Sequence, residues 1–303
     1  MPVMRLGYAR LRVEDLEAAK RHYAETLGMR VTAEGGGRIQ LKGWDEFDHH
    51  SVQLEEGGAG LAGLGYKCQS ADDLALYEDR ARAFGVTVER MSKGDHVAVG
   101  DGLRVTLPSE QTIELYCEME YVGTDVGLLN PEIRPRHTRG VDVPRLDHAA
   151  ITAPEPADVE RFFCEVLGFR ASERLVSDPG EAKLLASWLY CGQTMHDIAV
   201  LPGPPGKLSH IAFWVEDWHA ILNAGDIFAM DGTPVEVGPS RHGIGRALTS
   251  YFFDPSGNRN EVQTGSYRTY ADTPTVTWTA DQLAKGVFYI QREFSEGFLT
   301  GVT

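Results

Sequence analysis

This 303-residue chain contains the same order of elements twice, and that duplication limits the folds available to it. Residues 13–30 (VEDLEAAKRHYAETLGMR) and 153–170 (APEPADVERFFCEVLGFR) place their Leu-Gly pairs 140 residues apart, at Leu27 and Leu167. Both segments show apolar residues at three- and four-residue steps, and the glycine stands where a helix end favours positive φ. Because a strand-like run precedes each segment, we predict a strand–helix–strand unit in each half.

Two further pairs of segments support the duplication. Residues 64–74 (LGYKCQSADDL) resemble residues 208–218 (LSHIAFWVEDW), and residues 105–118 resemble residues 252–265. The offsets between the paired segments are 140, 144 and 147 residues, and small loop insertions explain the drift. Since strands outnumber helices, we predict an α+β protein of two domains, each with a strongly curved mixed sheet.

The segment between the copies, residues 130–145, is rich in Pro and Arg and lacks periodicity, as a linker does. We therefore predict an N-terminal repeat domain over residues 1–135 and a C-terminal domain over residues 136–303. The second domain includes a tail in which YADTPTVTW (270–278) is predicted to be extended and DQLAKGVFYIQREF (281–294) helical.

Composition restricts the partners and the compartment. The formal charge is −15, and such an acidic protein should repel a polyphosphate backbone, so we expect no nucleic-acid partner. No apolar stretch reaches the ~18 residues that cross a bilayer, and the N-terminus lacks the apolar run of a secretory signal, so we expect no membrane association. The four cysteines are widely spaced and form no C-x-x-C pair, which favours reduced thiols in the cytoplasm.

Three strand positions that carry chemistry can be compared between the two copies, and the copies differ at two of them. The second copy has two histidines and a glutamate there, and the first copy has two tyrosines and a glutamate. At the offsets above, the pairs are His148 with Tyr8, His210 with Tyr66, and Glu261 with Glu114.

Two imidazoles and one carboxylate on a common face form the 2-His-1-carboxylate set of non-heme Fe(II) enzymes, which leaves positions open for substrate and dioxygen. Taken singly, each residue is more often structural than a metal ligand. However, both histidines lie among apolar strand neighbours, and a buried carboxylate is costly unless it is compensated. A shared cation would compensate all three. Phenols, with a pKa of about 10, bind divalent ions poorly at pH 7, so we predict a metal site in the second copy alone.

The strongest local motif is His242-(x8)-Tyr251-x-x-Asp254-Pro255-x-Gly257-x-x-x-Glu261. With the duplication, it resembles the extradiol ring-cleaving dioxygenases of the vicinal oxygen chelate superfamily, and the resemblance covers essentially the whole chain. It implies two domains of paired βαβββ modules, the glyoxalase-like fold, with an inactive first domain and a catalytic, metal-binding second one. It also implies meta cleavage of catechol or an alkyl-catechol with O2 to 2-hydroxymuconate semialdehyde, in aromatic hydrocarbon degradation.

The resemblance assigns roles residue by residue. His148, His210 and Glu261 would bind Fe(II), with Mn(II) less expected, and His196 would be the acid–base histidine beside the metal. His242 and Tyr251 would hydrogen-bond the catecholate oxygens. Four residues are candidate pocket walls by resemblance, although core packing explains each as well: Trp188, Ile244, Val287 and Phe298.

The sequence departs from the family pattern at two positions. Ser250 stands where the family has an apolar residue, and this bears on details of the pocket. Val237 stands where relatives that act on homoprotocatechuate have an Arg, so an uncharged catechol is expected. The resemblance also implies a homotetramer.

Two other functions remain open at this point. A glyoxalase-type enzyme of the same superfamily would hold Zn or Ni, and a non-catalytic member would bind an aromatic ligand or drug. His196 has a repeat counterpart in His50, so a structural histidine inherited by both copies also remains open. We predict structural roles for five histidines: His49, His50, His96, His137 and His219.

Overall fold

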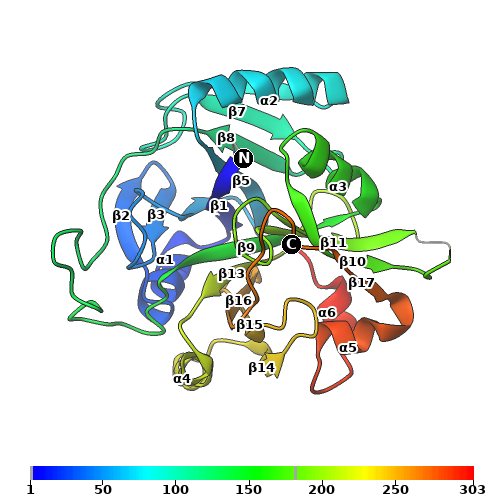
Figure 1. Cartoon of the computed structure of the whole chain (residues 1–303). Coiled ribbons are helices and arrows are strands. Elements are labelled where there is room, and N and C mark those ends of the chain that lie inside the picture. The colour runs from blue at the N-terminus through cyan, green and yellow to red at the C-terminus, as the bar shows by residue number, and fades with distance from the viewer. Residues whose placement is uncertain (1–2, 181–182) are drawn as a thin grey trace.

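The computed structural model describes residues 3–180 and 183–303, and in it each half of the chain forms one curved, mixed β-sheet (Figure 1). The first sheet has eight strands and the second has nine. Each half consists of two successive βαβββ modules, so the predicted α+β fold of paired modules is confirmed.

The first half runs from β1 to β8. Its elements are β1 (Val3–Val13), α1 (Leu16–Arg21), the π-helical turn η1 (His22–Thr26), β2 (Arg30–Gly35), β3 (Arg38–Lys42), β4 (Val52–Glu56), β5 (Gly60–Cys68), α2 (Ala71–Phe84), β6 (Val88–Met91), β7 (Gly102–Thr106) and β8 (Thr112–Tyr116). The strand order in the sheet is β2-β3-β4-β1-β5-β8-β7-β6.

The second half repeats this plan and adds a C-terminal tail. Its elements are β9 (Arg145–Ala153), α3 (Pro156–Glu165), β10 (Arg170–Val176), β11 (Leu184–Tyr190), β12 (Ile198–Pro202), β13 (Leu208–Trp214), α4 (Trp218–Asp231), β14 (Val235–Arg241), β15 (Leu248–Phe253), β16 (Arg259–Thr264), β17 (Val276–Thr279), the 3-10 turn η2 (Ala280–Gln282), α5 (Leu283–Val287) and α6 (Glu296–Thr300). The order is β14-β15-β16-β13-β9-β12-β11-β10-β17.

The helices of the two halves start and stop for the same local reasons. Ser70 caps α2 with a capping box to Asp73, and Asp217 caps α4 by accepting a hydrogen bond from the Ala220 backbone. Both helices end at a glycine in the left-handed region, Gly85 and Gly232. The N-caps of the two helices are therefore 147 residues apart, and so are their terminal glycines, whereas the sequence comparison gave an offset of 144 for this region.

The strand register confirms the offset of 147 and shows that the pairing of Tyr66 with His210 is wrong. Leu64 is paired with Ile113 between β5 and β8, and Ile211 is paired with Asn260 between β13 and β16. The first-half residue that corresponds to His210 is therefore Gly63. A shift of three residues moves a strand side chain to the opposite face of the sheet.

Tyr66 lies on that opposite face, in the core shared by the two halves. Its ring packs edge-on against Phe163 at 5.8 Å and Phe169 at 5.6 Å between centroids, and both partners belong to the second half. The hydrophobic core is continuous across the two halves at this point. Tyr66 thus has a packing role at the junction.

Asp254 of the motif is also structural. Its carboxylate accepts hydrogen bonds from the backbone N–H groups of Ser256 and Asn258, which forms the turn before β16. On the other side it accepts a hydrogen bond from the Tyr23 hydroxyl of the first half, at 3.2 Å. The motif therefore anchors the strand of Glu261 to the neighbouring half.

The connection between the halves spans residues 117–144, all of them described, and over this range it carries no helix or named strand, as the linker composition predicts. The predicted boundary between residues 135 and 136 falls inside this connection and stays a prediction. Three of its apolar side chains are largely exposed, at 82%, 87% and 90%: Leu128, Leu129 and Ile133.

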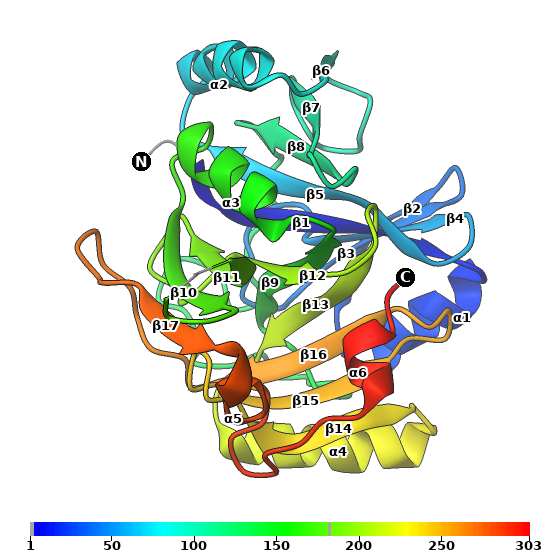
Figure 2. The ribbon, with the colours of Figure 1, turned by 90° about the vertical axis from the view of Figure 1, so that its right-hand side faces the viewer.

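The tail differs in part from the prediction. Of the segment predicted to be extended (270–278), only the last three residues lie in a strand, β17, which pairs with β10, and residues 271–272 form a turn. The helix expected over 281–294 is confined to α5, which ends at Val287. At Phe288 the backbone becomes extended, because the Tyr289 N–H donates to the carbonyl of Arg241 and Phe288 is buried. Figure 2 shows α5 and α6 beside the β14–β16 part of the second sheet.

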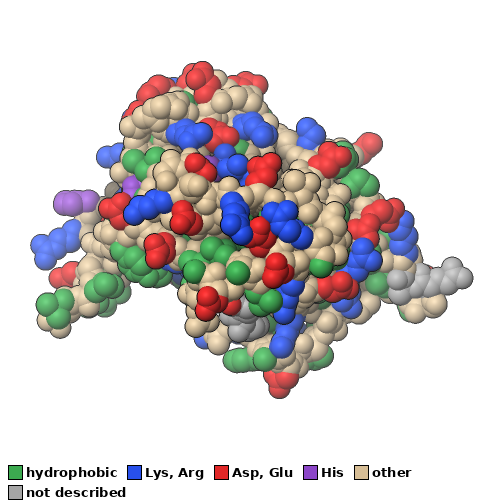
Figure 3. All heavy atoms as spheres, turned by 90° about the horizontal axis from the view of Figure 1, so that it is seen from above, with side chains coloured by type: hydrophobic (Ala, Val, Ile, Leu, Met, Phe, Trp, Pro, Cys, Tyr) green, Lys and Arg blue, Asp and Glu red, His purple; other side chains and the backbone are tan. Residues whose placement is uncertain are grey.

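The surface and the helix lengths bear on the expected partners. Acidic and basic side chains are intermingled on the face shown in Figure 3. Within residues 3–180 and 183–303, no helix has both the length and the apolar character to span a membrane. All four cysteines are free thiols.

Candidate active site

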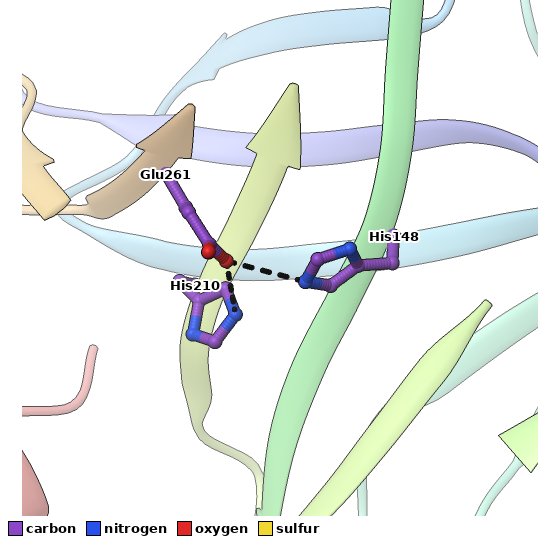
Figure 4. Close-up of side chains that lie close together, drawn as sticks. All are labelled: His148, His210 and Glu261. Atoms are coloured by element: carbon purple, nitrogen blue, oxygen red, sulfur yellow. Dashed lines mark ion pairs between the residues drawn. The ribbon is translucent and has the colours of Figure 1, made fainter. Parts of the chain in front are cut away.

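Three side chains from three neighbouring strands converge in the second half (Figure 4). The Nε2 atoms of His148 on β9 and His210 on β13 each lie 3.3 Å from Oε2 of Glu261 on β16. The donor atoms of the three residues all lie within 4.8 Å of one another, and all three side chains are buried. Ligand atoms about 2.1 Å from a divalent ion in an octahedral site lie roughly 3 Å apart, so this spacing fits one ion.

The register of the central strand β13 explains the convergence. Ala212 is paired with His148 on one side and with Glu261 on the other, so both side chains project from the same face of the sheet. His210 is two residues before Ala212 and therefore shares that face. The small side chain of Ala212 leaves the space between its neighbours open.

Further polar residues, which the sequence pattern does not single out, orient these donors. Asp147 Oδ2 lies 2.9 Å from Nδ1 of His148 and accepts a hydrogen bond from Gln263 at 2.7 Å. The hydroxyl of Thr249 donates to Oε1 of Glu261. Carboxylates that hold metal-binding imidazoles commonly fix the ring orientation and the tautomer in this way. The only feature of the sequence that could have indicated this role for Asp147 is its position directly before His148.

The charges of the site fit a bound cation. Burial alone would lower the pKa of His148, but its contacts with Asp147 and Glu261 raise it to about 9. Burial would raise the pKa of Glu261, but its hydrogen bonds with His148 and His210 hold it well below its usual range. Burial lowers the pKa of His210 to about 4. The carboxylates of Asp147 and Glu261 thus favour a positive charge at this buried site. A divalent ion with neutral imidazole ligands would supply that charge.

The other predicted site residues surround the cluster. The ring of His196 lies against that of His148, with centroids 3.9 Å apart. Nε2 of His242 lies 3.0 Å from the Tyr251 hydroxyl and 3.6 Å from Oε1 of Glu261. Desolvation, together with the nearby His148, lowers the pKa of His196 well below its usual range, so its ring is neutral at pH 7.

These residues open into one cavity of about 210 Å³. All four candidate wall residues line it, namely Trp188, Ile244, Val287 and Phe298. The lining is mostly apolar apart from the cluster itself, as in many small-molecule sites. Since an apolar cavity of about 150 Å³ can hold benzene, this one has room for a single aromatic ring with a small substituent.

The same region of the first half is filled by its own side chains. At the positions that match Ala150, Ala199 and Leu201 of the second half, the first half has larger polar residues that hydrogen-bond to one another. These are Arg10, Gln53 and Glu55. Gln40, which matches Trp188, donates a hydrogen bond to Gln53 at 3.0 Å. The first half thus keeps the strands and replaces the cavity with a polar network.

Protein cations occupy the place that corresponds to the metal. Glu114, which matches Glu261, is fully buried and receives hydrogen bonds from Arg10 at 2.6 Å and from the Tyr8 hydroxyl at 2.6 Å. Nε2 of His96 lies 2.9 Å from the same carboxylate. Arg104, which matches Tyr251, donates to it at 3.3 Å. With a tyrosine in place of His148 and Gly63 in place of His210, the metal-binding set is incomplete in this half.

Glu114→Gln is expected to destabilise the protein by about 3 kcal/mol, because it removes one of the two carboxylates, Glu114 and Glu55, that pair with the Arg10 guanidinium. Burial opposes ionisation of Glu114, but His96 and Arg10 lower its pKa to about 2. The stabilisation is therefore complete above pH 4.5 and is lost as the pH falls toward 2. Denaturant unfolding of both proteins at pH 7 and pH 3 measures it. Equal stability at pH 7 would contradict the network.

Comparisons with known families agree with this architecture. Residues 145–262 match the Glyoxalase/Bleomycin resistance protein/Dioxygenase superfamily, and residues 63–120 match the Catechol 2,3-dioxygenase-like N-terminal domain. The superfamily match includes the three clustered residues and the motif around Tyr251. The second match covers part of the half whose cavity is filled.

Individual relatives match nearly the whole chain. A metapyrocatechase of Pseudomonas sp. (strain CF600) is 37% identical over 99% of both chains. A manganese-dependent 2,3-dihydroxybiphenyl 1,2-dioxygenase of Geobacillus genomosp. 3 is 26% identical over 97% of this chain and 96% of its own. The crystal structure of the 2,3-dioxygenase LapB from Pseudomonas sp. KL28 is 37% identical, covers 93% of this chain and 99% of its own, and has a TM-score of 0.89. With a buried two-histidine, one-carboxylate cluster in its second half and relatives of this kind along its whole length, this chain belongs to the extradiol dioxygenases of the glyoxalase superfamily.

Proposed function

We propose that the protein cleaves catechol or a small alkyl-catechol beside the diol with O2, and that 2-hydroxymuconate semialdehyde is the product from catechol. The observation that carries this proposal is the position of the cluster of His148, His210 and Glu261 within an apolar cavity of about 210 Å³. When bound there, a divalent ion would lower the pKa of the diol hydroxyls and supply positions for both reactants.

The residues of the chain supply orientation and proton transfer. Tyr251 and His242 lie together on one side of the cluster, where the hydroxyl and the imidazole can hydrogen-bond the diol oxygens. His196 lies against His148. Because its ring is neutral at pH 7, it can accept a proton from a hydroxyl and return it later in the reaction. The apolar walls exclude water, which strengthens each of these polar contacts.

An uncharged catechol fits the cavity best. Among the described residues that line it there is no Lys or Arg, so the carboxylate of a charged substrate would lack a partner there. Val237, the position singled out in the sequence, lies on β14 and is paired with Tyr251 in the sheet. This position also presents no cation to a substrate.

Iron is the metal we propose. The donor set accepts either Fe(II) or Mn(II), and the relatives include a manganese-dependent enzyme. The test uses apoprotein reconstituted without oxygen with either ion, then mixed with catechol in air. We expect a yellow product absorbing near the visible edge with Fe(II) and a weaker or absent signal with Mn(II). A colourless mixture with iron in the protein would contradict catechol cleavage and favour a binding protein.

The glyoxalase alternative is disfavoured by the comparisons and not by the placement of the ligands. His148 belongs to the first module of the second half, and His210 and Glu261 belong to the next one, so the cluster spans two modules as a glyoxalase site does. The full-length relatives named above are ring-cleaving dioxygenases.

We further infer a homotetramer in the cytoplasm. The exposed apolar side chains of Leu128, Leu129 and Ile133 support an interface between copies. The four free cysteines are in keeping with a reducing compartment.

A further inference from the structure

Glu173 on β10 is a buried carboxylate that none of the roles above uses. The residue is 2% exposed. It accepts three hydrogen bonds, all from neutral donors: the Gly245 backbone N–H at 2.8 Å, the Tyr267 hydroxyl at 2.8 Å, and the Trp278 indole N–H. The three donors belong to three different segments of the second half.

A carboxylate in such a place needs a reason, because burial of a charge costs several kcal/mol unless strong hydrogen bonds offset it. Hydrogen bonds to an ionised acceptor are about twice as strong as neutral ones. Glu173 therefore binds the segments of Gly245, Tyr267 and Trp278 more firmly than a neutral side chain would. The corresponding residue of the first half, where polar side chains fill the cavity, is Ala33.

The contacts of Trp278 extend this anchorage to the tail and to the loop after β14. A Cβ atom added to Gly243 would lie 3.0 Å from the Trp278 ring, so the ring packs directly on the loop backbone. The carbonyl of Gly286 in α5 accepts hydrogen bonds from the N–H groups of Gly243 and Ile244, both at 2.9 Å. The loop and α5 thus form one unit that rests on Trp278.

This unit sets the orientation of His242. Nδ1 of His242 is hydrogen-bonded to the backbone carbonyl of Val287, the residue after Gly286. Since a carbonyl can only accept, Nδ1 carries the proton, and Nε2 faces the Tyr251 hydroxyl at 3.0 Å. On the other side, the Gly245 N–H that Glu173 holds is next to Ile244, a wall of the cavity.

We propose that Glu173 is a positioning residue for the aromatic substrate: through Gly245 and Trp278 it holds Ile244 and His242 where the ring binds. The inference rests on the proposed function for its substrate. Glu173 is not among the described residues that line the cavity, and its hydrogen bonds go to Gly245, Tyr267 and Trp278. Its removal should therefore disturb substrate binding more than metal binding.

Glu173→Gln is the sharpest test, because it keeps the size of the side chain and replaces one acceptor by an NH2 donor. In either orientation of the amide, its NH2 group faces another donor, the Gly245 N–H or the Trp278 indole N–H. We expect native metal content and a kcat/KM about 10- to 100-fold lower, with most of the loss in KM, because a misplacement of about 1 Å at a binding site can cost about 10²-fold. Trp278→Phe removes one of the two conflicts, so the double variant should lose less than the two single losses combined.

Glu160→Gln is the matched control. Glu160 pairs with Arg174, the residue after Glu173 on β10, at 2.7 Å, so this variant removes a carboxylate beside the same strand without touching the loop or the tail. It should keep the native KM.

Anaerobic titration of the metal-loaded protein with catechol gives the dissociation constant independently of turnover. A larger dissociation constant for Glu173→Gln than for the native protein supports the inference. It does so even if the native protein fails to cleave catechol, a result that would overturn only the proposed function. A native dissociation constant and KM in Glu173→Gln would overturn the inference. The inference would also be overturned if Glu173→Gln lost metal and thermal stability along with its activity, because the effect would then be general destabilisation.

Discussion

Glu261→Gln and His210→Ala are each expected to leave the purified protein without its metal ion and to reduce catechol cleavage to background. The amide cannot supply the negative charge that Glu261 brings to a cluster with both histidine Nε2 atoms 3.3 Å from its Oε2. Loss of a group behind a ligand already weakens metal binding by about 10- to 100-fold, and loss of a ligand itself should exceed that. Elemental analysis for iron and the rate of product formation measure the two effects.

The structure supplies a matched control at the equivalent position of the other half. Glu114→Gln replaces the corresponding carboxylate in the filled first half, so it should lower stability while metal content and turnover stay native. Circular dichroism of all three variants checks that they fold. If Glu261→Gln and His210→Ala both retain stoichiometric iron and the native rate, the assignment of these residues as ligands is wrong.

The duplicated fold could be predicted from the sequence because helix ends and periodicity are local signals. Gly28 and Gly168 follow the first helix of each half, and both adopt the positive φ that the sequence analysis expects there. The register between strands was harder to predict. An offset of 144 residues aligns the sequence around Tyr66 with that around His210. The strand register instead matches the pair Leu64–Ile113 to the pair Ile211–Asn260, an offset of 147, so that Gly63 corresponds to His210.

Contacts across long separations were also beyond the sequence. The carbonyl of Val287 is 45 residues from His242, and Trp278 is 105 residues from Glu173. No periodicity marks such a pair, because the partners lie in a loop, a short helix and an edge strand. The shortened tail helix has the same origin, since Tyr289 pairs with the backbone of Arg241 and leaves the helical conformation.

His196→Phe is expected to retain iron and to bind catechol, but to slow turnover by about 10²- to 10⁴-fold, the range typical of acid–base residues. The phenyl ring fills the same space beside His148, where the centroids lie 3.9 Å apart, but it can neither accept nor donate a proton. The rate at saturating catechol and oxygen measures the effect, and iron content and anaerobic catechol binding show that the site is otherwise intact.

His50→Phe separates catalysis from an inherited structural role. His50 is buried in the first half, where its ring lies 5.4 Å from that of Tyr8, as His196 lies beside His148. If both histidines serve only packing, the two variants should lose similar stability and neither should slow turnover. If His196 transfers protons, only His196→Phe should slow it, and with iron and catechol both bound the slowed step must follow substrate binding. An unchanged rate in His196→Phe at saturating substrates would remove this residue from the mechanism.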